Sequence, residues 1–250
     1  MDYLEDMIYV NKSVLEKSVK SFAKNWMIVL TAIVYTVINL ILYRLLGIVF
    51  RGPLFILSGI ASALVMSSIV SNYLYLLFNI VNYNRLTIND FKEGFTNYVR
   101  KIYGVFFVGY LGSLLLQMVV PVLGPLGNYL DIAIYIVMGI ALNALPETIY
   151  LKSYDAWESI LYALEFLKEN WLNWVIPNAV FYISIYLISG NILLNVFDTH
   201  LAFNFAKSPL YILMYAISQI VFSFMMIYRG HLYKILSTST RRKRMFMKKI

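Results

Sequence analysis

The chain has 250 residues, of which 60% are hydrophobic and 14% charged, and its formal net charge at neutral pH is +8. Soluble domains are about 45–50% apolar and about 25% charged, so this composition excludes an ordinary water-soluble protein. Cysteine is absent, which excludes disulfides and thiolate chemistry. The basic residues lie between and after apolar runs, where they indicate membrane topology, and we do not expect nucleic-acid binding.

Six apolar runs are each long enough for a membrane span, which needs about 20 residues to cross a hydrocarbon core of about 30 Å. Backbone exposed to lipid must satisfy its own hydrogen bonds, so these runs are expected to be helical. The expected spans cover residues 26–50, 54–81, 102–123, 129–145, 171–197 and 209–236. The sequence therefore predicts an all-α fold, a polytopic transmembrane helix bundle in residues 1–240 as a single domain, followed by a basic tail at 241–250.

The positive charges predict an orientation. If the N-terminus is inside, all of the 21 lysines and arginines except Arg44, Arg51 and Lys207 fall on the cytoplasmic side, with Arg229 at the inner end of the sixth span. An excess of Lys and Arg marks cytoplasmic loops. We therefore expect a multi-pass protein of the plasma (inner) membrane with both termini in the cytoplasm.

Three amphipathic segments precede spans on the cytoplasmic side. The first covers residues 13–26. The second begins near Asp90 and has Thr87 as its cap, and the third covers residues 155–170. A serine, threonine or aspartate before such a segment can accept hydrogen bonds from its first free amides. The repeating unit would be an interfacial helix plus a transmembrane hairpin, used three times.

A short motif supports this repeat. Lys24-Asn25-Trp26 is echoed by Glu169-Asn170-Trp171, each at the start of a span, whereas the middle unit lacks the Asn-Trp pair. Parallel repeats of this kind occur in transporters. The alternative is that any interfacial helix anchored by tryptophan would show this pattern.

Catalytic and metal-binding motifs are missing from the sequence. The two histidines, His200 and His231, would lie on opposite sides of the membrane and cannot share a metal ion. Nucleotide-binding glycine loops and the Gly-x-Ser-x-Gly nucleophile pattern are also absent. We therefore expect no enzyme activity, no cofactor and no metal site.

Charges are expected only toward the ends of the spans. Mid-membrane acids or bases usually mark ion-coupled transport, and the apolar runs hold none near their centres. Arg44 and Arg51 share a helix face and are expected to extend to the outer interface. The alternative is a cationic patch at the outer mouth, with Asp131 as its partner.

Uncharged polar residues are frequent inside the runs. Such side chains usually hydrogen-bond between helices, and the alternative is a polar path that recognises a substrate. The candidates for either role are Asn39, Asn72, Asn79, Gln117, Asn178 and Gln219.

The segment before the fifth span is acidic although it faces the cytoplasm. An acidic amphipathic helix is repelled by an anionic membrane surface, so we expect it to bind a protein, an ATPase being one option. The candidate residues are Asp155, Glu158, Glu165 and Glu169. The basic tail is expected to bind membrane lipids, because each basic residue near an anionic leaflet contributes about 1 kcal/mol.

The helix end Ala144-Leu145-Pro146-Glu147, followed by a capped amphipathic helix from Asp155 to Asn170 and the next span, carries a family resemblance. This arrangement resembles poorly characterised prokaryotic six-helix membrane families, including the membrane domain fused to some glycerophosphodiester phosphodiesterases. The resemblance covers most of the chain and rests on pattern. It implies an integral membrane domain with no catalytic residues to carry over, and no phosphodiesterase domain is present.

Three functions are compatible with these features. The first is a non-catalytic membrane subunit of a larger assembly, either permease-like or a scaffold. The second is the transmembrane subunit of an ATP-driven exporter, with residues 155–170 as its coupling helix. The third is a membrane enzyme acting on lipids, for which Asn143, Glu147, Asn82 and Arg85 are the nearest polar cluster at one interface.

Overall fold

The computed structural model describes the chain except residues 1–2, 51, 53–54, 194, 204–207 and 240–250. Within those limits the fold consists of helices and the segments that join them, with no strand. Three helical hairpins form most of it. They are α2 (Thr31–Val49) with α3 (Phe55–Tyr83), α5 (Val99–Val119) with α6 (Pro125–Ala141), and α8 (Ala156–Ser189) with α9 (Pro209–Thr238). Six helical segments are long and apolar enough to cross a membrane, which confirms the predicted all-helical, multi-pass class.

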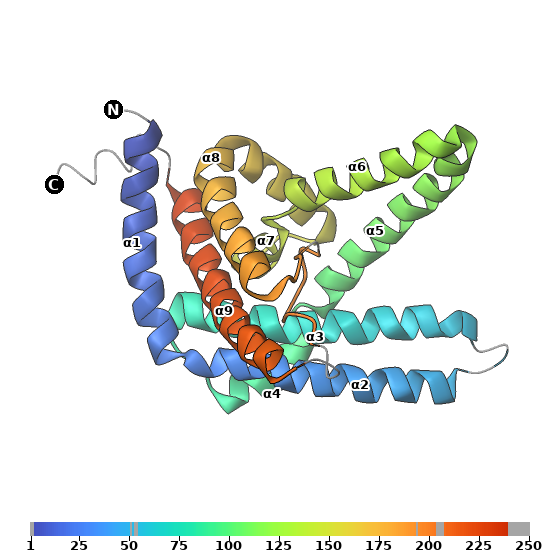
Figure 1. Ribbon diagram of the computed structural model, residues 1–250, viewed down its shortest axis with the longest axis horizontal. Helices are drawn as coiled ribbons and strands as arrows, with labels where there is room; N and C mark the ends of the chain where they lie inside the picture. The colour runs from blue at the N-terminus through green and yellow to red at the C-terminus, as the bar shows by residue number, and fades with distance from the viewer. Residues whose placement is uncertain (1–2, 51, 53–54, 194, 204–207, 240–250) are drawn as a thin grey trace.

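Further helices connect or precede the hairpins. They are α1 (Tyr3–Lys24), the 3-10 helices η1 (Trp26–Leu30) and η3 (Val120–Leu123), α4 (Ile88–Asn97) and α7 (Leu145–Leu151). Figure 1 shows that the α2–α3 and α5–α6 hairpins point in different directions from a common base, while α1 lies alongside α9.

The packing of these elements is cyclic. Helix α4 packs against α3, the hairpin helix that precedes it, and α8 packs against α7, the short helix that precedes it. Helix α1, the first described helix, packs against α9, the last described helix. Three hairpin units thus form a closed arrangement in which the first and last helices meet.

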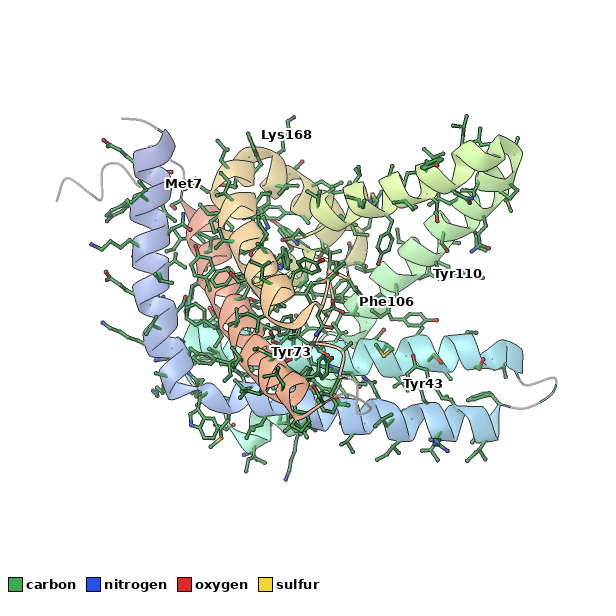
Figure 2. The ribbon with its side chains drawn as sticks, in the orientation of Figure 1. Met7, Tyr43, Tyr73, Phe106, Tyr110 and Lys168 are labelled. Atoms are coloured by element: carbon green, nitrogen blue, oxygen red, sulfur yellow. The ribbon has the colours of Figure 1, made fainter. Side chains whose placement is uncertain are left out.

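The core lies where the hairpins meet, and the free ends of two hairpins are exposed. Tyr73 of α3 is 1% exposed and lies at the centre in Figure 2, in contact with Tyr35 and Phe222. Tyr43 and Tyr110, on the protruding hairpins, are 71% and 57% exposed. Large apolar side chains without protein neighbours fit a surface covered by lipid.

The fifth predicted span is too long. Helix α8 ends at Ser189, because Gly190 adopts the left-handed conformation (φ 71°) that commonly terminates helices. Instead of continuing the helix, the following segment folds against the bundle, and its Phe197 and Leu201 side chains are buried. Leu201 N–H donates to Gln219 Oε1 of α9 at 3.0 Å. The apolar residues that follow α8 therefore belong to an irregular segment packed on the protein and not to a continuation of the helix.

The amphipathic segments are formed with different boundaries. The first is α1, which begins at Tyr3 and not at residue 13. The second, α4, carries the expected cap: Asp90 N–H donates to Thr87 Oγ1 at 3.1 Å, and Thr87 N–H to Asp90 Oδ2 at 2.8 Å. The third is continuous with the fifth span and forms the first part of α8.

The structure shows that the middle unit also contains a counterpart of the Asn-Trp pair, which the sequence pattern did not indicate. Asn25, Asn97 and Asn170 each donate a side-chain hydrogen bond to the carbonyl oxygen four residues earlier, at 2.8, 2.8 and 3.1 Å. An aromatic residue follows each asparagine, and in the middle unit it is Tyr98. The pair is therefore asparagine plus any aromatic residue, and all three units contain it.

Candidate functional site

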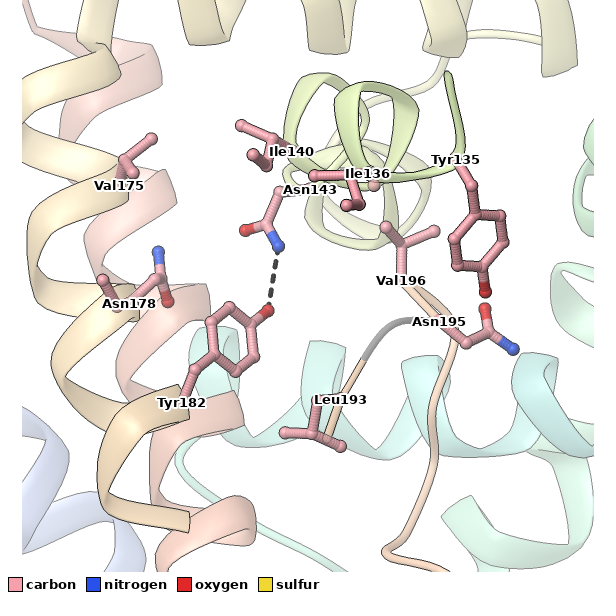
Figure 3. A pocket seen from close by; sticks show the side chains of 12 residues that line it. Tyr135, Ile136, Ile140, Asn143, Val175, Asn178, Tyr182, Leu193, Asn195 and Val196 are labelled. Carbon is pink, nitrogen blue, oxygen red and sulfur yellow. Dashed lines mark hydrogen bonds between the residues drawn. The ribbon is translucent and has the colours of Figure 1, made fainter. Parts of the chain in front are cut away.

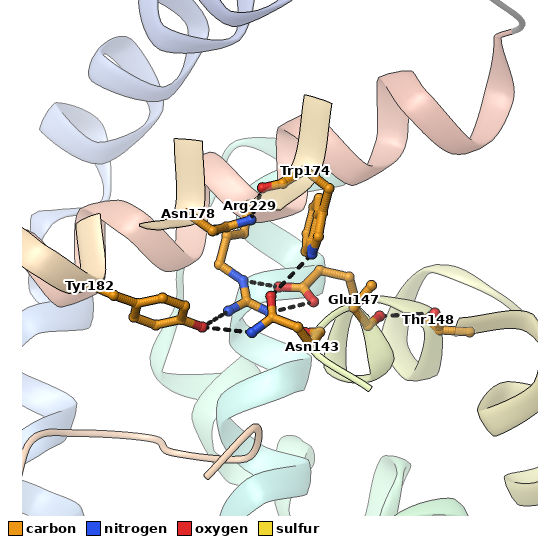
Figure 4. Close-up of polar contacts among 8 residues, drawn as sticks. Asn143, Glu147, Thr148, Trp174, Asn178, Tyr182 and Arg229 are labelled. Atoms are coloured by element: carbon orange, nitrogen blue, oxygen red, sulfur yellow. Dashed lines mark hydrogen bonds and ion pairs between the residues drawn. The ribbon is translucent and has the colours of Figure 1, made fainter. Parts of the chain in front are cut away.

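The site is built on a buried ion pair between Arg229 of α9 and Glu147 of α7 (Figure 4). Arg229 Nε donates to Glu147 Oε1 at 2.8 Å, and Nη2 donates to Oε2 at 2.9 Å. The two side chains are 2% and 0% exposed. Two parallel bonds are the strongest geometry for this pair. The expectation that Arg229 is a topological charge at the inner surface was wrong, because its side chain is inside the bundle.

Local sequence explains how the two charges meet. Pro146 lies in the first turn of α7, where a missing N–H breaks no helical bond. Glu147 follows in the same turn, near the free amides of the helix start. On α9, the residue after the arginine is Gly230, and a Cβ there would lie 2.5 Å from the Tyr150 hydroxyl oxygen. The glycine therefore permits α9 to approach α7 closely.

Three further side chains enclose the guanidinium. Arg229 Nη1 donates to the Tyr182 hydroxyl at 2.7 Å, and Nη2 donates to the Asn143 carbonyl at 2.5 Å. Asn143 Nδ2 donates to Tyr182 at 2.8 Å, and its Oδ1 accepts from Trp174 Nε1 at 3.0 Å. The Trp174 ring centroid lies 5.3 Å from the guanidinium carbon. The network joins α8 and α9 to the segment between α6 and α7.

A pocket of about 270 Å³ lies beside this network, between α6, α8 and the segment after α8; we name it the α6–α8 pocket (Figure 3). Its apolar walls include Ile136, Ile140, Val175, Leu193 and Val196. Its polar lining side chains are Tyr135, Asn143, Asn178, Tyr182 and Asn195. Asn143 and Tyr182 belong to the ion-pair network as well, so Arg229 fixes two polar groups of the pocket.

Asn178 contributes an unsatisfied acceptor to this pocket. Its side chain is 2% exposed, and Nδ2 donates to the Trp174 carbonyl at 2.7 Å. Among the described residues, no group donates to Asn178 Oδ1. A buried polar atom without a partner costs about 1–3 kcal/mol. Asn178 Oδ1 is one of nine such side-chain atoms among the described residues, and it is the one whose residue lines this pocket.

The other predicted polar residues hold helices together or lie on the surface. Asn72 accepts from the Tyr35 hydroxyl at 2.6 Å and donates to the Phe91 carbonyl, which links α2, α3 and α4. Gln219 fixes the segment after α8, as described above. Asn79 bonds within its own helix, Asn39 is half-buried between α2 and α3, and Gln117 is exposed on α5. The structure brings none of these five to the α6–α8 pocket.

The acidic candidates share one exposed surface of α8. Asp155 caps the helix by accepting from Glu158 N–H at 2.8 Å. Glu158, Glu165 and Glu169 are exposed beside an outward-facing stripe of large apolar side chains. That stripe consists of Trp157, Leu161, Leu164 and Trp171.

Arg44 and Asp131, two of the charges suggested for an outer patch, do not lie together. Both are exposed, and they lie on α2 and α6, whose hairpins point in different directions in Figure 1. Helix α6 begins at Pro125, so Asp131 lies in its second turn and not at its start. Arg51 lies outside the described residues.

The polar cluster suggested for a lipid enzyme separates into two places. Asn143 and Glu147 join Arg229, as described. Asn82 instead accepts from Lys234 Nζ at 2.7 Å, and the Arg85 guanidinium lies over the ring of the neighbouring Tyr83. The cluster is therefore not a single site.

Two titratable groups lie in the segment after α8, outside the candidate spans. Burial raises the pKa of Asp198 to about 6, and a backbone hydrogen bond near Asn195 opposes this shift. Burial lowers the pKa of His200. The His200 ring lies near Tyr35, with centroids 6.3 Å apart, and Thr199 shares a hydrogen bond with His200 Nδ1 at 2.9 Å. Burial thus shifts each group toward its neutral form relative to the unfolded chain.

No group of three or more His, Asp or Glu side chains in the described ranges is placed to hold a metal ion. Comparison of the chain with known protein families, characterised proteins and solved structures finds no match. The geometry of the site therefore carries the functional argument.

Proposed function

We propose that the protein is a non-catalytic, permease-like integral membrane protein that binds a small amphipathic molecule in the α6–α8 pocket. The observation that carries this proposal is the buried acceptor Asn178 Oδ1, which has no partner among the described residues and belongs to a residue that lines the pocket. Ligand pockets are typically apolar with a few placed polar groups. The α6–α8 pocket has this composition.

The pocket opens beside exposed residues of α6, which supports entry of the ligand from the lipid. Tyr135, Ile136 and Ile140 line the pocket and are 54%, 48% and 52% exposed. These residues belong to α6, and the opposite wall of the pocket belongs to α8. Both helices are candidate membrane spans. An opening between two spans faces the bilayer, so a ligand with an alkyl chain can enter sideways.

The bonding of the charged residues supports a non-catalytic role. Both carboxylate oxygens of Glu147 are bonded to Arg229, and the guanidinium is further bonded to Tyr182 and Asn143. A general base needs an unoccupied oxygen within hydrogen-bond reach of its substrate. The pair is better suited to positioning the pocket than to proton transfer.

Binding can be measured with Trp174, which donates to Asn143 at the edge of the pocket. Replacing Trp26, Trp157 and Trp171 by phenylalanine leaves Trp174 as the single tryptophan. The purified protein in a non-brominated detergent is then titrated with 2-bromododecan-1-ol, whose bromine lies beside its polar head and quenches indole fluorescence at short range. We expect saturable quenching.

Two phenylalanine substitutions on α8 provide the matched control. Ala179 lines the pocket, and Ala179→Phe should abolish saturable quenching by filling it. The neighbouring Val180 is 60% exposed, and Val180→Phe should leave quenching unchanged. Equal saturable quenching in both variants would show that the probe binds elsewhere and would refute the proposal.

A second candidate function is that of a subunit in a larger assembly. The exposed acidic side chains of α8, next to the stripe of Trp157, Leu161, Leu164 and Trp171, support a cytoplasmic protein partner. An ATPase that uses residues 155–170 as a coupling helix is one such partner. Changing Glu158, Glu165 and Glu169 to lysine should remove a partner that co-purifies with the native chain in mild detergent. Recovery of the same partner with the charge-reversed chain would contradict this role.

A further inference from the structure

Two hydrogen-bonding groups of α8 at the α6–α8 pocket define the chemistry of its ligand, on the premise that the pocket binds one as proposed above. The first is the acceptor Asn178 Oδ1. The orientation of this amide is fixed, because Nδ2 donates to the Trp174 carbonyl at 2.7 Å and an oxygen in that position would be repelled. Oδ1 is therefore directed away from that carbonyl, and the ligand must supply a donor.

The second group is the Tyr182 hydroxyl. Its oxygen accepts from Arg229 Nη1 at 2.7 Å and from Asn143 Nδ2 at 2.8 Å, and both partners are obligate donors. The hydroxyl hydrogen must therefore point elsewhere, and no described group accepts it. Two donors to the same oxygen, one of them cationic, polarise the hydroxyl and make it a stronger donor. The ligand must therefore also supply an acceptor.

The two groups are close enough to bind one polar head. Asn178 and Tyr182 are four residues apart on α8, so they are neighbours on the same helix face. Figure 3 shows them one above the other on the same side of the pocket. A donor and an acceptor in the same small head can reach both.

The charge of the pocket favours a neutral head. Among the described residues, its lining includes no Asp, Glu, Lys or Arg. The nearest cation, Arg229, is already paired with Glu147 through two hydrogen bonds. A charged head would lose its hydration without gaining a partner of opposite charge.

The size of the pocket limits how much of the ligand it encloses. At about 30 Å³ for each water-sized group, its volume of about 270 Å³ holds roughly nine such groups. This is enough for a small head and the first part of an alkyl chain. The remaining chain would extend through the mouth into the lipid.

We infer that the ligand is a neutral single-chain amphiphile whose head carries both a hydrogen-bond donor and an acceptor, with a primary alkyl amide as the simplest example. The amide N–H donates to Asn178 Oδ1, and the amide oxygen accepts from the Tyr182 hydroxyl. The apolar walls contact the first carbons of the chain.

The test is displacement of 2-bromododecan-1-ol from the Trp174 reporter by four compounds with equal chain length. Dodecanamide has a donor and an acceptor, methyl dodecanoate has only acceptors, dodecanoate is anionic and dodecylammonium is cationic. We expect dodecanamide to displace the probe at a concentration about tenfold lower than each of the others, because each net hydrogen bond contributes a few-fold in affinity.

Asn178→Leu should reduce the affinity for dodecanamide to that for methyl dodecanoate while leaving the ester unchanged. The control is Asn173→Leu one turn earlier on α8, which is outside the pocket lining and should preserve the preference for the amide. If the ester matches the amide in the native chain, the inference fails while the proposed function stands. Strongest displacement by dodecanoate would likewise refute it. Absence of saturable binding by the native chain would refute both the inference and the proposed function.

Discussion

At the scale of single residues, the pairing of Arg229 with Glu147 determines what the site can do. Neither charge is exposed, so each depends on the other for the interactions that water would otherwise provide. The same guanidinium positions Tyr182 and Asn143 at the pocket. A change at the ion pair should therefore affect both the stability of the fold and the binding of ligand.

We expect Glu147→Gln to lower the free energy of unfolding by about 3–5 kcal/mol, because it leaves the Arg229 charge buried without a counter-ion. The double variant Glu147→Gln with Arg229→Met removes both charges and should recover most of this loss. Unfolding by SDS in mixed micelles measures each variant in a double-mutant cycle. A double variant less stable than Glu147→Gln alone would contradict the argument.

The segment after α8 should give the protein opposing responses to acid and base. Burial raises the pKa of Asp198 from 3.8 to about 6, so the folded state binds this proton more tightly than the unfolded chain. That contribution to stability is complete below pH 4 and is lost as the pH rises through 6. Asp198→Asn should therefore be more stable than the native chain at pH 7.5, by about 1 kcal/mol because Asp198 is partly exposed.

The sign reverses at His200, whose pKa is lowered by burial. Its neutral form contributes stability above pH 6.5 that is lost as the pH falls through the lowered value. His200→Gln should therefore resist acid better than the native chain. Melting temperatures from pH 4.5 to 8 check both variants, and an advantage of Asp198→Asn that is the same at every pH would exclude titration as its cause.

At the scale of elements, close approach between helices depends on small residues at defined positions. Helix α4 lies on α3 at Gly94, where a Cβ would be 2.9 Å from Asn72 Nδ2 and 3.1 Å from Asn72 Cα. Asn72 cannot move freely, because it also accepts a hydrogen bond from Tyr35. The contact therefore has no space for a methyl group.

Gly94→Ala should destabilise the protein, because overpacking costs about 1–3 kcal/mol and exceeds the gain of about 1 kcal/mol in helix propensity. The control is Gly109→Ala on α5, where no described atom lies within 4 Å of the added methyl group. That substitution should stabilise by up to about 1 kcal/mol. Chemical unfolding in detergent compares the two, and changes of the same sign would contradict the packing argument.

The sequence predicts the candidate spans well where the length of an apolar run alone defines them. It predicts the fifth span poorly, because residues 191–197 are apolar and read as helix, although Gly190 ends α8 and the segment packs on protein. Hydropathy does not distinguish burial in lipid from burial in protein. The same ambiguity affects Arg229, since an arginine near the end of an apolar run resembles an interfacial charge. One signal was available, namely the nine residues of α9, 230–238, that continue beyond it.

The site itself is only partly predictable. Asn178 was recognised as an unusual polar residue, and Asn143 and Glu147 were grouped as a polar cluster at one interface. Their connection to Arg229 depends on α7 and α9 meeting in space, 82 residues apart along the chain. No local periodicity encodes that contact, so it could not be predicted from one sequence.

At the scale of the whole molecule, three similar units form a closed arrangement that constrains topology. Each unit contains an amphipathic segment and two candidate spans. If both candidate spans of each unit cross the membrane, the unit returns the chain to the side from which it started, and we expect the amphipathic segments to lie on one side. The strong bias in Lys and Arg predicts that this side is the cytoplasm.

Reporter fusions test this arrangement directly, because each unit has one expected outer turn and one inner connection. Fusions after residues 124 and 200 should report the outer side: Gly124 lies at the turn between α5 and α6, and His200 lies between α8 and α9. Fusions after residues 90 and 155 should report the cytoplasm, since both precede a span that starts inside. A span missing from any unit would invert the signal at every later fusion position. Inversion at some but not all of the four positions would therefore refute the threefold arrangement. Inversion at all four would refute only the cytoplasmic assignment.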